Sequence, residues 1–261
     1  MIRGDQVWVT NAEADAKAFY AICFNRKNGD IVQEVKLFTE EKPAFCHAYN
    51  SYASCTPVLE EGRLYFHFGS YGTGCLDTAT GKTLWLRRDL PCDHWRGPGS
   101  SPVVHGDYLL LTFDGHDRQY VTALKKSSGE TAWTKDRDIV YSVNDGDLKK
   151  AYSTPTVLKV DGKEQVISPA AEATIAYDLK TGDEVWRVIH GGMNAACRPV
   201  VGHGLIYLVS GHNKNLLAVP QGRTGDLTKA VVWRSNRGVP SRPSLLLKDD
   251  LLFLVNDEGV A

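Results

Sequence analysis

The stretch AYDLKTGDEVW at residues 176–186 decides the fold, because it recurs along the chain with constant internal spacing. Its equivalents are CLDTATGKTLW at residues 75–85 and ALKKSSGETAW at residues 123–133. In each copy a small residue is followed by a T-G or S-G turn, and a Trp stands four residues after the glycine. Divergent copies around Asn28-Gly29 and Thr224-Gly225 extend a repeat of about 48 residues over the chain.

A proline marks each repeat a second time, and the residues that follow it predict strands. Each proline opens a short apolar run, and further β-rich runs of about five residues follow, separated by turn residues. The glycine of the T-G turn allows the positive φ that a tight hairpin needs. No apolar pattern of helical period exceeds two turns, so each repeat is predicted to be a meander of four antiparallel strands. The prolines are Pro57, Pro102, Pro155, Pro199 and Pro243.

Four-stranded sheets repeated at this period predict an all-β fold, a β-propeller, because a single meander cannot bury both faces and must stack on its neighbours. An open β-sandwich is the alternative, and the fixed period favours the propeller. We expect one domain over residues 1–261 with about five and a half blades, the first lacking its first strand. Residues 6–10 and 251–255 both look like second strands, so they do not complement each other. We therefore expect a fragment of a seven- or eight-bladed propeller, incomplete at both ends.

Open ends of that kind would expose apolar sheet faces. In the first blade the expected face comprises Val7, Val9, Ile22 and Phe24, and in the last it comprises Leu245, Leu247, Leu252 and Leu254.

Composition narrows the range of partners. Lys plus Arg is 30 and Asp plus Glu is 31, which gives a net charge of -1. A general nucleic-acid binder needs a basic surplus to displace counterions, so nucleic acid is not an expected partner. The apolar runs are too short for a membrane-spanning helix, and the first residues carry no signal-peptide pattern.

The A-x-D-x-x-T-G-x-x-x-W pattern of residues 176–186 resembles the pyrroloquinoline quinone (PQQ)-like repeat, and the residues 75–85 and 123–133 match it with few changes. The whole chain resembles a PQQ-like β-propeller, in particular the secreted repeat proteins of planctomycete-type bacteria. This resemblance implies a periplasmic or secreted location. The motif specifies the blade and does not by itself specify the cofactor.

The Trp of each repeat is predicted to dock one blade on the next, because it follows the hairpin turn and faces the neighbouring sheet. We expect these side chains to be mostly buried, and truncation of one of them to be costly. The four are Trp85, Trp133, Trp186 and Trp233.

The six cysteines do not form an obvious disulfide framework. Cys23 and Cys75 fill the small-residue slot of the repeat, and Cys55 and Cys197 stand two residues before a proline, where Ser stands in other repeats. These four are expected to be buried free thiols. Cys46 and Cys92 lie in equivalent loops of adjacent blades, where they could form a disulfide or stay as two thiols.

The loops that precede each proline should surround the mouth of the central channel, because that proline opens the innermost strand. Polar and aromatic side chains that converge on one funnel suit a binding site, whereas solvated loop residues are the simpler alternative. Three arginines favour an anionic or carboxylate-bearing partner. Asn144–Asp147 resembles the opening of a calcium loop but lacks the closing Glu, which favours an exposed turn. The candidate funnel residues are His47, Asn50, Tyr52, His94, Trp95, Arg96, Tyr152, Arg198 and Arg242.

From these features we expect a non-enzymatic scaffold that binds a protein, peptide or polysaccharide, with no cofactor, metal or catalytic residue. A quinoprotein, PQQ-dependent dehydrogenase is the first alternative. The resemblance then implies a planar Trp beneath the quinone, a calcium ion held by Glu and Asn, and an Asp base. The funnel loops show no acidic cluster that would supply such carboxylates, which argues against this alternative. A carbohydrate-binding propeller is the second alternative, because paired carboxylates for hydrolysis are absent while aromatic residues are present.

Overall fold

The computed structural model describes residues 1–261 and contains five sheets of four or five strands and one of two strands. Neighbouring strands within each of the first five repeats pair antiparallel in chain order, which is the expected meander. The chain contains no α-helix, only two short 3-10 turns, Gly146–Lys149 and Gly211–Asn213. The prediction of an all-β propeller fold is confirmed.

The strands fall into blades as follows. Blade 1 holds β1 (Ile2–Arg3), β2 (Gln6–Ala12), β3 (Ala18–Asn25) and β4 (Ile31–Thr39); blade 2 holds β5 (Val58–Glu60), β6 (Arg63–His67), β7 (Thr73–Asp77) and β8 (Thr83–Arg87); blade 3 holds β9 (Val103–His105), β10 (Tyr108–Asp114), β11 (Gln119–Lys125) and β12 (Thr131–Asp136). Blade 4 holds β13 (Thr156–Val160), β14 (Lys163–Pro169), β15 (Ala173–Asp178) and β16 (Glu184–Ile189), with β20 (Gly225–Asp226) added at its edge; blade 5 holds β17 (Val200–Gly202), β18 (Leu205–Val209), β19 (Leu216–Pro220) and β21 (Trp233–Ser235); the last sheet is the hairpin β22 (Leu246–Lys248) and β23 (Leu251–Phe253).

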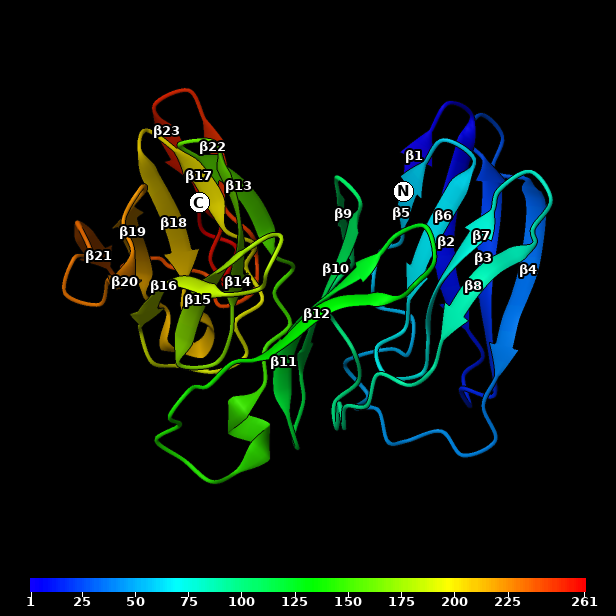
Figure 1. Cartoon of the computed structure of the whole chain (residues 1–261), viewed down its shortest axis with the longest axis horizontal. Coiled ribbons are helices and arrows are strands. Elements are labelled where there is room, and N and C mark those ends of the chain that lie inside the picture. Colours follow the sequence, from blue (N-terminus) through cyan, green and yellow to red (C-terminus); the bar gives the residue numbers. More distant parts are fainter.

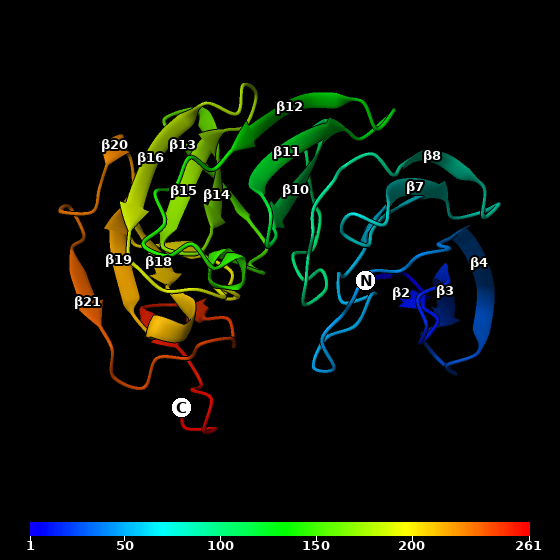
Figure 2. The same ribbon diagram turned by 90° about the horizontal axis from the view of Figure 1, so that it is seen from below.

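The blades follow one another along an arc, from blade 1 on the right of Figure 1 to the hairpin β22–β23 on the left. The fourth strands β4, β8, β12, β16 and β21 lie on the outer side of the arc (Figure 2). The strands of blade 1 pair with no strand of the last hairpin. The prediction that blade 1 lacks its first strand was wrong, because Ile2 and Arg3 form a short first strand that pairs with Val7 and Gln6.

The hydrophobic core lies between the blades, in five clusters that each join one sheet to the next. Trp8 and Phe19 of blade 1 pack on Leu64 and Phe66 of blade 2, and the same arrangement repeats along the arc to Leu245 beside the last hairpin. A single meander is stable only when it packs against a neighbouring blade, because an isolated sheet would leave an apolar face in water.

The exposed face of the last hairpin is opposite to the one expected. Leu245 is buried, and Leu247, Leu252 and Leu254 pack against the cluster of blade 5. Side chains alternate across a strand, so this register turns the intervening residues outward. The exposed apolar side chains there are Leu246, Leu251, Phe253 and Val255. In blade 1 the expected face is only partly exposed, and Ile22 is buried.

Two of the repeat Trp residues, Trp85 and Trp133, dock on the turn of the next blade. Trp133 is buried and its Nε1 donates to the carbonyl of Leu179 at 2.9 Å, and Trp85 donates in the same way to Lys126 at 3.0 Å. Trp186 is also buried, and it packs in one cluster with Leu227. Burial was wrongly expected for Trp233, which is 39% exposed because the following sheet has only two strands and no T-G turn to cover it.

All six cysteines are free, so the disulfide considered between Cys46 and Cys92 does not form. The two thiols have different surroundings: Cys46 Sγ lies 3.6 Å from the carbonyl oxygen of Arg96, while Cys92 Sγ lies 3.8 Å from His94 Nδ1 inside the core between blades 2 and 3. Cys23, Cys55, Cys75 and Cys197 are buried and unpaired, as expected. Burial raises the pKa of the Cys55 thiol to about 12, which keeps it protonated.

Candidate functional site

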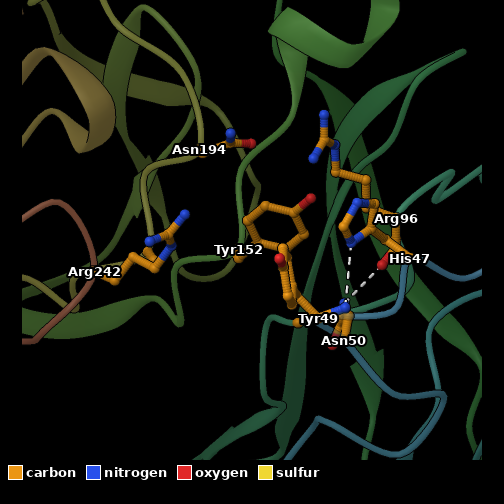
Figure 3. Close-up of a pocket in the computed structure, with 9 residues that line it drawn as sticks. His47, Tyr49, Asn50, Arg96, Tyr152, Asn194 and Arg242 are labelled. Atoms are coloured by element: carbon orange, nitrogen blue, oxygen red, sulfur yellow. Dashed lines mark hydrogen bonds between the residues drawn. The ribbon is translucent and has the colours of Figure 1, made fainter.

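The loops before the prolines do converge, and they enclose a pocket of about 280 Å³ at one end of the axis. We call it the funnel pocket. His47, Asn50, Arg96, Tyr152 and Arg242 line it, as the loop positions predicted. Figure 3 shows the ring of Tyr152 between the guanidinium groups of Arg96 and Arg242, which come from loops far apart in the sequence. Tyr49, Gly99, Asn194 and Ala196 complete the lining.

The two guanidinium groups differ in what balances their charge. Arg96 forms a two-bonded ion pair with Asp147, with Nε 2.6 Å from Oδ1, and this contact raises the pKa of Arg96 and lowers that of Asp147. Arg242 has no hydrogen-bond or ion-pair partner in the chain, although it lines the same pocket. The free guanidinium of Arg242 therefore carries an uncompensated positive charge at the pocket wall.

A buried lysine adds to the positive charge behind the pocket. The side chain of Lys150 is fully buried, its Nζ donates to the carbonyl of His94, and the same Nζ lies 5.3 Å from the ring centre of Tyr152. Burial lowers the pKa of Lys150. A buried cation this close to the Tyr152 ring favours an anionic ligand in the pocket.

Asn194 holds the clearest unused polar group of the pocket. Its backbone is in the left-handed region at φ 53°, held there by hydrogen bonds from Asn194 N to Lys150 O and from Tyr152 N to Ala195 O, both 2.8 Å. The residue is 9% exposed, and its Oδ1 has no hydrogen-bond partner. A buried acceptor without a donor is costly, so this oxygen is poised to accept from a bound group.

Four of the candidate residues lie outside the funnel pocket. Tyr52 donates its hydroxyl to Ala44 at 3.0 Å and packs on the core of blades 1 and 2. His94 accepts from the Ser70 N–H at 3.1 Å, and burial lowers its pKa to about 3. Trp95 is 45% exposed and rests on Phe45 with 5.2 Å between ring centres. Arg198 lines a different cavity along the axis.

Two polar residues at the pocket escaped sequence reasoning. Asp147 belongs to the segment expected to be an exposed turn, and it is instead the half-buried ion-pair partner of Arg96, presented by a 3-10 turn that Asp145 caps. Asn194 was passed over although Asn tolerates left-handed backbone better than most residues, which is the signal that could have found it. No group of three or more His, Cys, Asp or Glu side chains is placed to hold a metal ion.

The structure contains no α-helix of the length and hydrophobicity that a membrane crossing requires.

Two curated proteins with significant sequence similarity to the chain are methanol dehydrogenase subunits. The chain is 30% identical over 165 residues to subunit 1 of methanol dehydrogenase [cytochrome c] from Methylorubrum extorquens, and 31% identical over 163 residues to the same subunit from Methylobacterium organophilum. Each alignment covers 52% of this chain and 23% of the relative. The chain thus spans about a quarter of the length of the curated relatives it matches.

The solved structures resemble the chain in fold. A europium-containing methanol dehydrogenase has a TM-score of 0.63 at 12% sequence identity, over 90% of this chain and 50% of that structure. The quinohemoprotein alcohol dehydrogenase of Comamonas testosteroni has a TM-score of 0.58 at 13% identity, over 84% of this chain and 41% of that structure.

These similarities overturn the expectation of a non-enzymatic scaffold. That expectation rested on the lack of an acidic cluster in the funnel loops, and the sequence similarity to the methanol dehydrogenase subunits argues against it. The model of the family described as "Outer membrane protein assembly factor BamB", a PQQ-repeat family, matches residues 2–135, which is more than half of the chain. The chain therefore belongs to this family of PQQ-repeat β-propellers.

Proposed function

We propose that this chain forms propeller blades of a quinoprotein dehydrogenase that oxidises an alcohol. We propose further that its funnel pocket binds the carboxylate groups of PQQ. The observation that carries the proposal is the unpaired guanidinium of Arg242 at the wall of that pocket. Sequence similarity to methanol dehydrogenase over half of the chain supports the same reading. An extracytoplasmic location is proposed with it, from the family resemblance alone.

The pocket residues suit an anionic quinone in part. PQQ is a planar tricarboxylate, and Arg242 offers a planar fork of donors that matches a carboxylate. The Tyr152 ring supplies a flat aromatic surface beside it, and Asn194 Oδ1 supplies an unused acceptor. A metal ion fits less well, because none of the nine lining residues is an Asp or Glu.

PQQ, when bound, would supply the two-electron oxidation of an alcohol. In this proposal Arg242 binds and orients the quinone. The Arg96–Asp147 pair fixes the position of the Arg96 guanidinium at the pocket wall, because both its Nε and one Nη are committed to the carboxylate. The charge of Lys150, close to the Tyr152 ring, favours binding of an anion in the pocket. We assign the proton-accepting step to no residue of this chain.

Quinone retention and turnover test the proposal. The purified chain is incubated with PQQ, with and without calcium, desalted, and examined for quinone absorbance and for alcohol-dependent reduction of an artificial electron-accepting dye. Retention of about one quinone per chain is expected, and Arg242→Gln should lose most of it. Lys248→Gln, at an exposed position in the last hairpin, is the matched control for loss of one surface cation. Absence of retained quinone under both conditions would contradict the proposal.

A further inference from the structure

A second cavity, of about 410 Å³, adjoins the funnel pocket, with which it shares Ala196. We call it the inner cavity. Its lining comes from Met1 and from residues at or near the blade prolines, and it includes no Asp or Glu. Its polar side chains are those of Thr56, Ser101, Thr154, Arg198 and Ser244.

Hydroxyl groups in the inner cavity link neighbouring blades through a repeated hydrogen bond. The N–H of Thr56 donates to Ser101 Oγ at 2.9 Å, and the N–H of Ser101 donates to Thr154 Oγ1 at 3.1 Å. All three residues stand directly before the proline of their blade, so one position of the repeat forms a ladder. The Ser101 and Thr154 hydroxyls accept in these bonds and donate to no group of the chain, which leaves two O–H donors beside the cavity.

Arg198 interrupts this ladder. It stands before Pro199, at the position that Ser101 and Thr154 occupy in their blades, but it has no hydroxyl. By the symmetry of the repeat, the N–H of Thr154 points to this position, and it makes no hydrogen bond within the chain. In the last repeat this position is Arg242, which also lacks a hydroxyl, and the Arg198 N–H donates instead to Oγ of Ser244, the residue after Pro243, at 3.1 Å.

Arg198 is an exposed residue, and its guanidinium is oriented on one side and free on the other. Its Nε donates to Thr156 Oγ1 at 3.2 Å, and the Thr156 hydroxyl in turn donates to the carbonyl of Pro199 at 2.9 Å. Neither Nη group has a partner, and no carboxylate lines the cavity to balance the charge. A guanidinium held in this way presents two parallel donors, the arrangement that binds the paired oxygens of a carboxylate or phosphate.

We propose that the break in the hydroxyl ladder is a binding site for one small oxyanion group, a carboxylate or a phosphate. The Nη groups of Arg198 supply the charge. The N–H of Thr154 and the hydroxyls of Thr154 and Ser101 supply neutral donors on the adjoining wall. The site uses neither guanidinium of the funnel pocket, so it does not depend on quinone binding.

Amide chemical shifts test the proposal directly. The full chain, labelled with 15N, is titrated with inorganic phosphate and separately with acetate, at constant ionic strength. The Thr154 amide resonance should move in a saturable way, since its N–H gains an acceptor. Tighter binding of phosphate would identify a phosphate group as the natural ligand, and tighter binding of acetate would identify a carboxylate.

Matched variants separate this site from general charge effects. Arg198→Ser restores the hydroxyl found in the neighbouring blades and should weaken anion binding at least about tenfold without unfolding the chain. Arg198→Gln tests loss of the charge alone and should weaken binding likewise. Arg242→Gln, in the funnel pocket, should leave the titration unchanged. The proposal is overturned if the Thr154 resonance moves with neither anion, or moves equally in the wild type and in Arg198→Ser.

Discussion

The indole ring of Trp133 lies against the backbone of Gly182, the turn glycine of the next blade. A Cβ at position 182 would stand 2.6 Å from Cδ2 of that ring, well inside normal contact. Trp85 and Gly129 repeat the relationship one blade earlier, and in the first repeat Gln33 takes the place of the Trp beside Gly81. The T-G turn therefore needs glycine for two reasons, the positive φ of the hairpin and the close approach of the preceding blade.

Gly182→Ala should destabilise the protein more than a turn glycine without a neighbour would. Gly162 is the control, because it has φ 79° against 73° for Gly182, but a Cβ there meets nothing within 4 Å. Left-handed backbone should cost either variant about 1–2 kcal/mol. Overpacking against Trp133 should add about 1–3 kcal/mol for Gly182→Ala alone. Equal free energies of unfolding for the two variants in denaturant titrations would argue against the contact.

Truncation of the repeat tryptophans should give unequal losses of stability. Trp133→Ala removes a buried ring and its hydrogen bond to Leu179, and it should cost about 3–5 kcal/mol. Trp233→Ala removes a ring that is 39% exposed, so its cost should be clearly smaller. Unfolding monitored by circular dichroism compares the two, and similar losses would show that Trp233 is docked in solution.

Arg137 and Asp114 form a fully buried ion pair between blades 3 and 4. Nε of Arg137 lies 2.5 Å from Asp114 Oδ1, Nη2 lies 2.6 Å from Oδ2, and Nη1 donates to the carbonyl of Ser168 at 3.2 Å. Arg137→Met should cost about 3–5 kcal/mol, because it strands a buried carboxylate. The double variant Arg137→Met with Asp114→Leu should recover part of that loss. A double variant no more stable than the single one would mean that the pair is not the source of the cost.

Buried histidines should make the protein sensitive to mild acid. Burial lowers the pKa of His67 to about 3, and its Nδ1 lies 2.7 Å from Thr73 Oγ1. The unfolded chain takes up this proton below about pH 6.5 and the folded chain does not, so the free energy of unfolding should fall as the pH drops from 6.5 toward 3.

His67→Gln isolates this contribution. Between pH 4 and 6 the slope of unfolding free energy against pH should decrease by up to about 1.4 kcal/mol per pH unit relative to the wild type. The slope, and not the absolute stability, is the readout, because the substitution also disturbs packing against Phe113. An unchanged slope would show that His67 is not held neutral by the fold.

The repeat could be predicted because one local pattern is used in every blade. The T-G turn meets the backbone requirement of the hairpin, and the Trp four residues later packs on the next blade. Trp85 and Trp133 do so in the same way. Trp233 could not be placed by the pattern, because its burial depends on the following sheet. The insertion after Gly225 likewise sends Leu227 into the core between blades 4 and 5.

The site was only partly predictable for a related reason. The prolines place His47, Arg96 and Arg242 around one mouth, since each precedes an innermost strand. Asn194 and Asp147 reach the pocket through irregular loops, whose path depends on tertiary hydrogen bonds that no sequence period records. The functional class was misjudged because basic and aromatic loops suit many ligands, whereas the similarity to a methanol dehydrogenase subunit extends over 165 residues.

The affinity for PQQ compared with that for its trimethyl ester tests the central claim most directly. The ester keeps the ring system and lacks the negative charges that Arg242 is proposed to bind. The wild type should bind PQQ at least about tenfold more tightly than the ester, and Arg242→Gln should remove most of that difference. Equal affinities of the wild type for the two compounds, or a preference that survives in Arg242→Gln, would contradict the assignment of the funnel pocket to the carboxylates of the quinone.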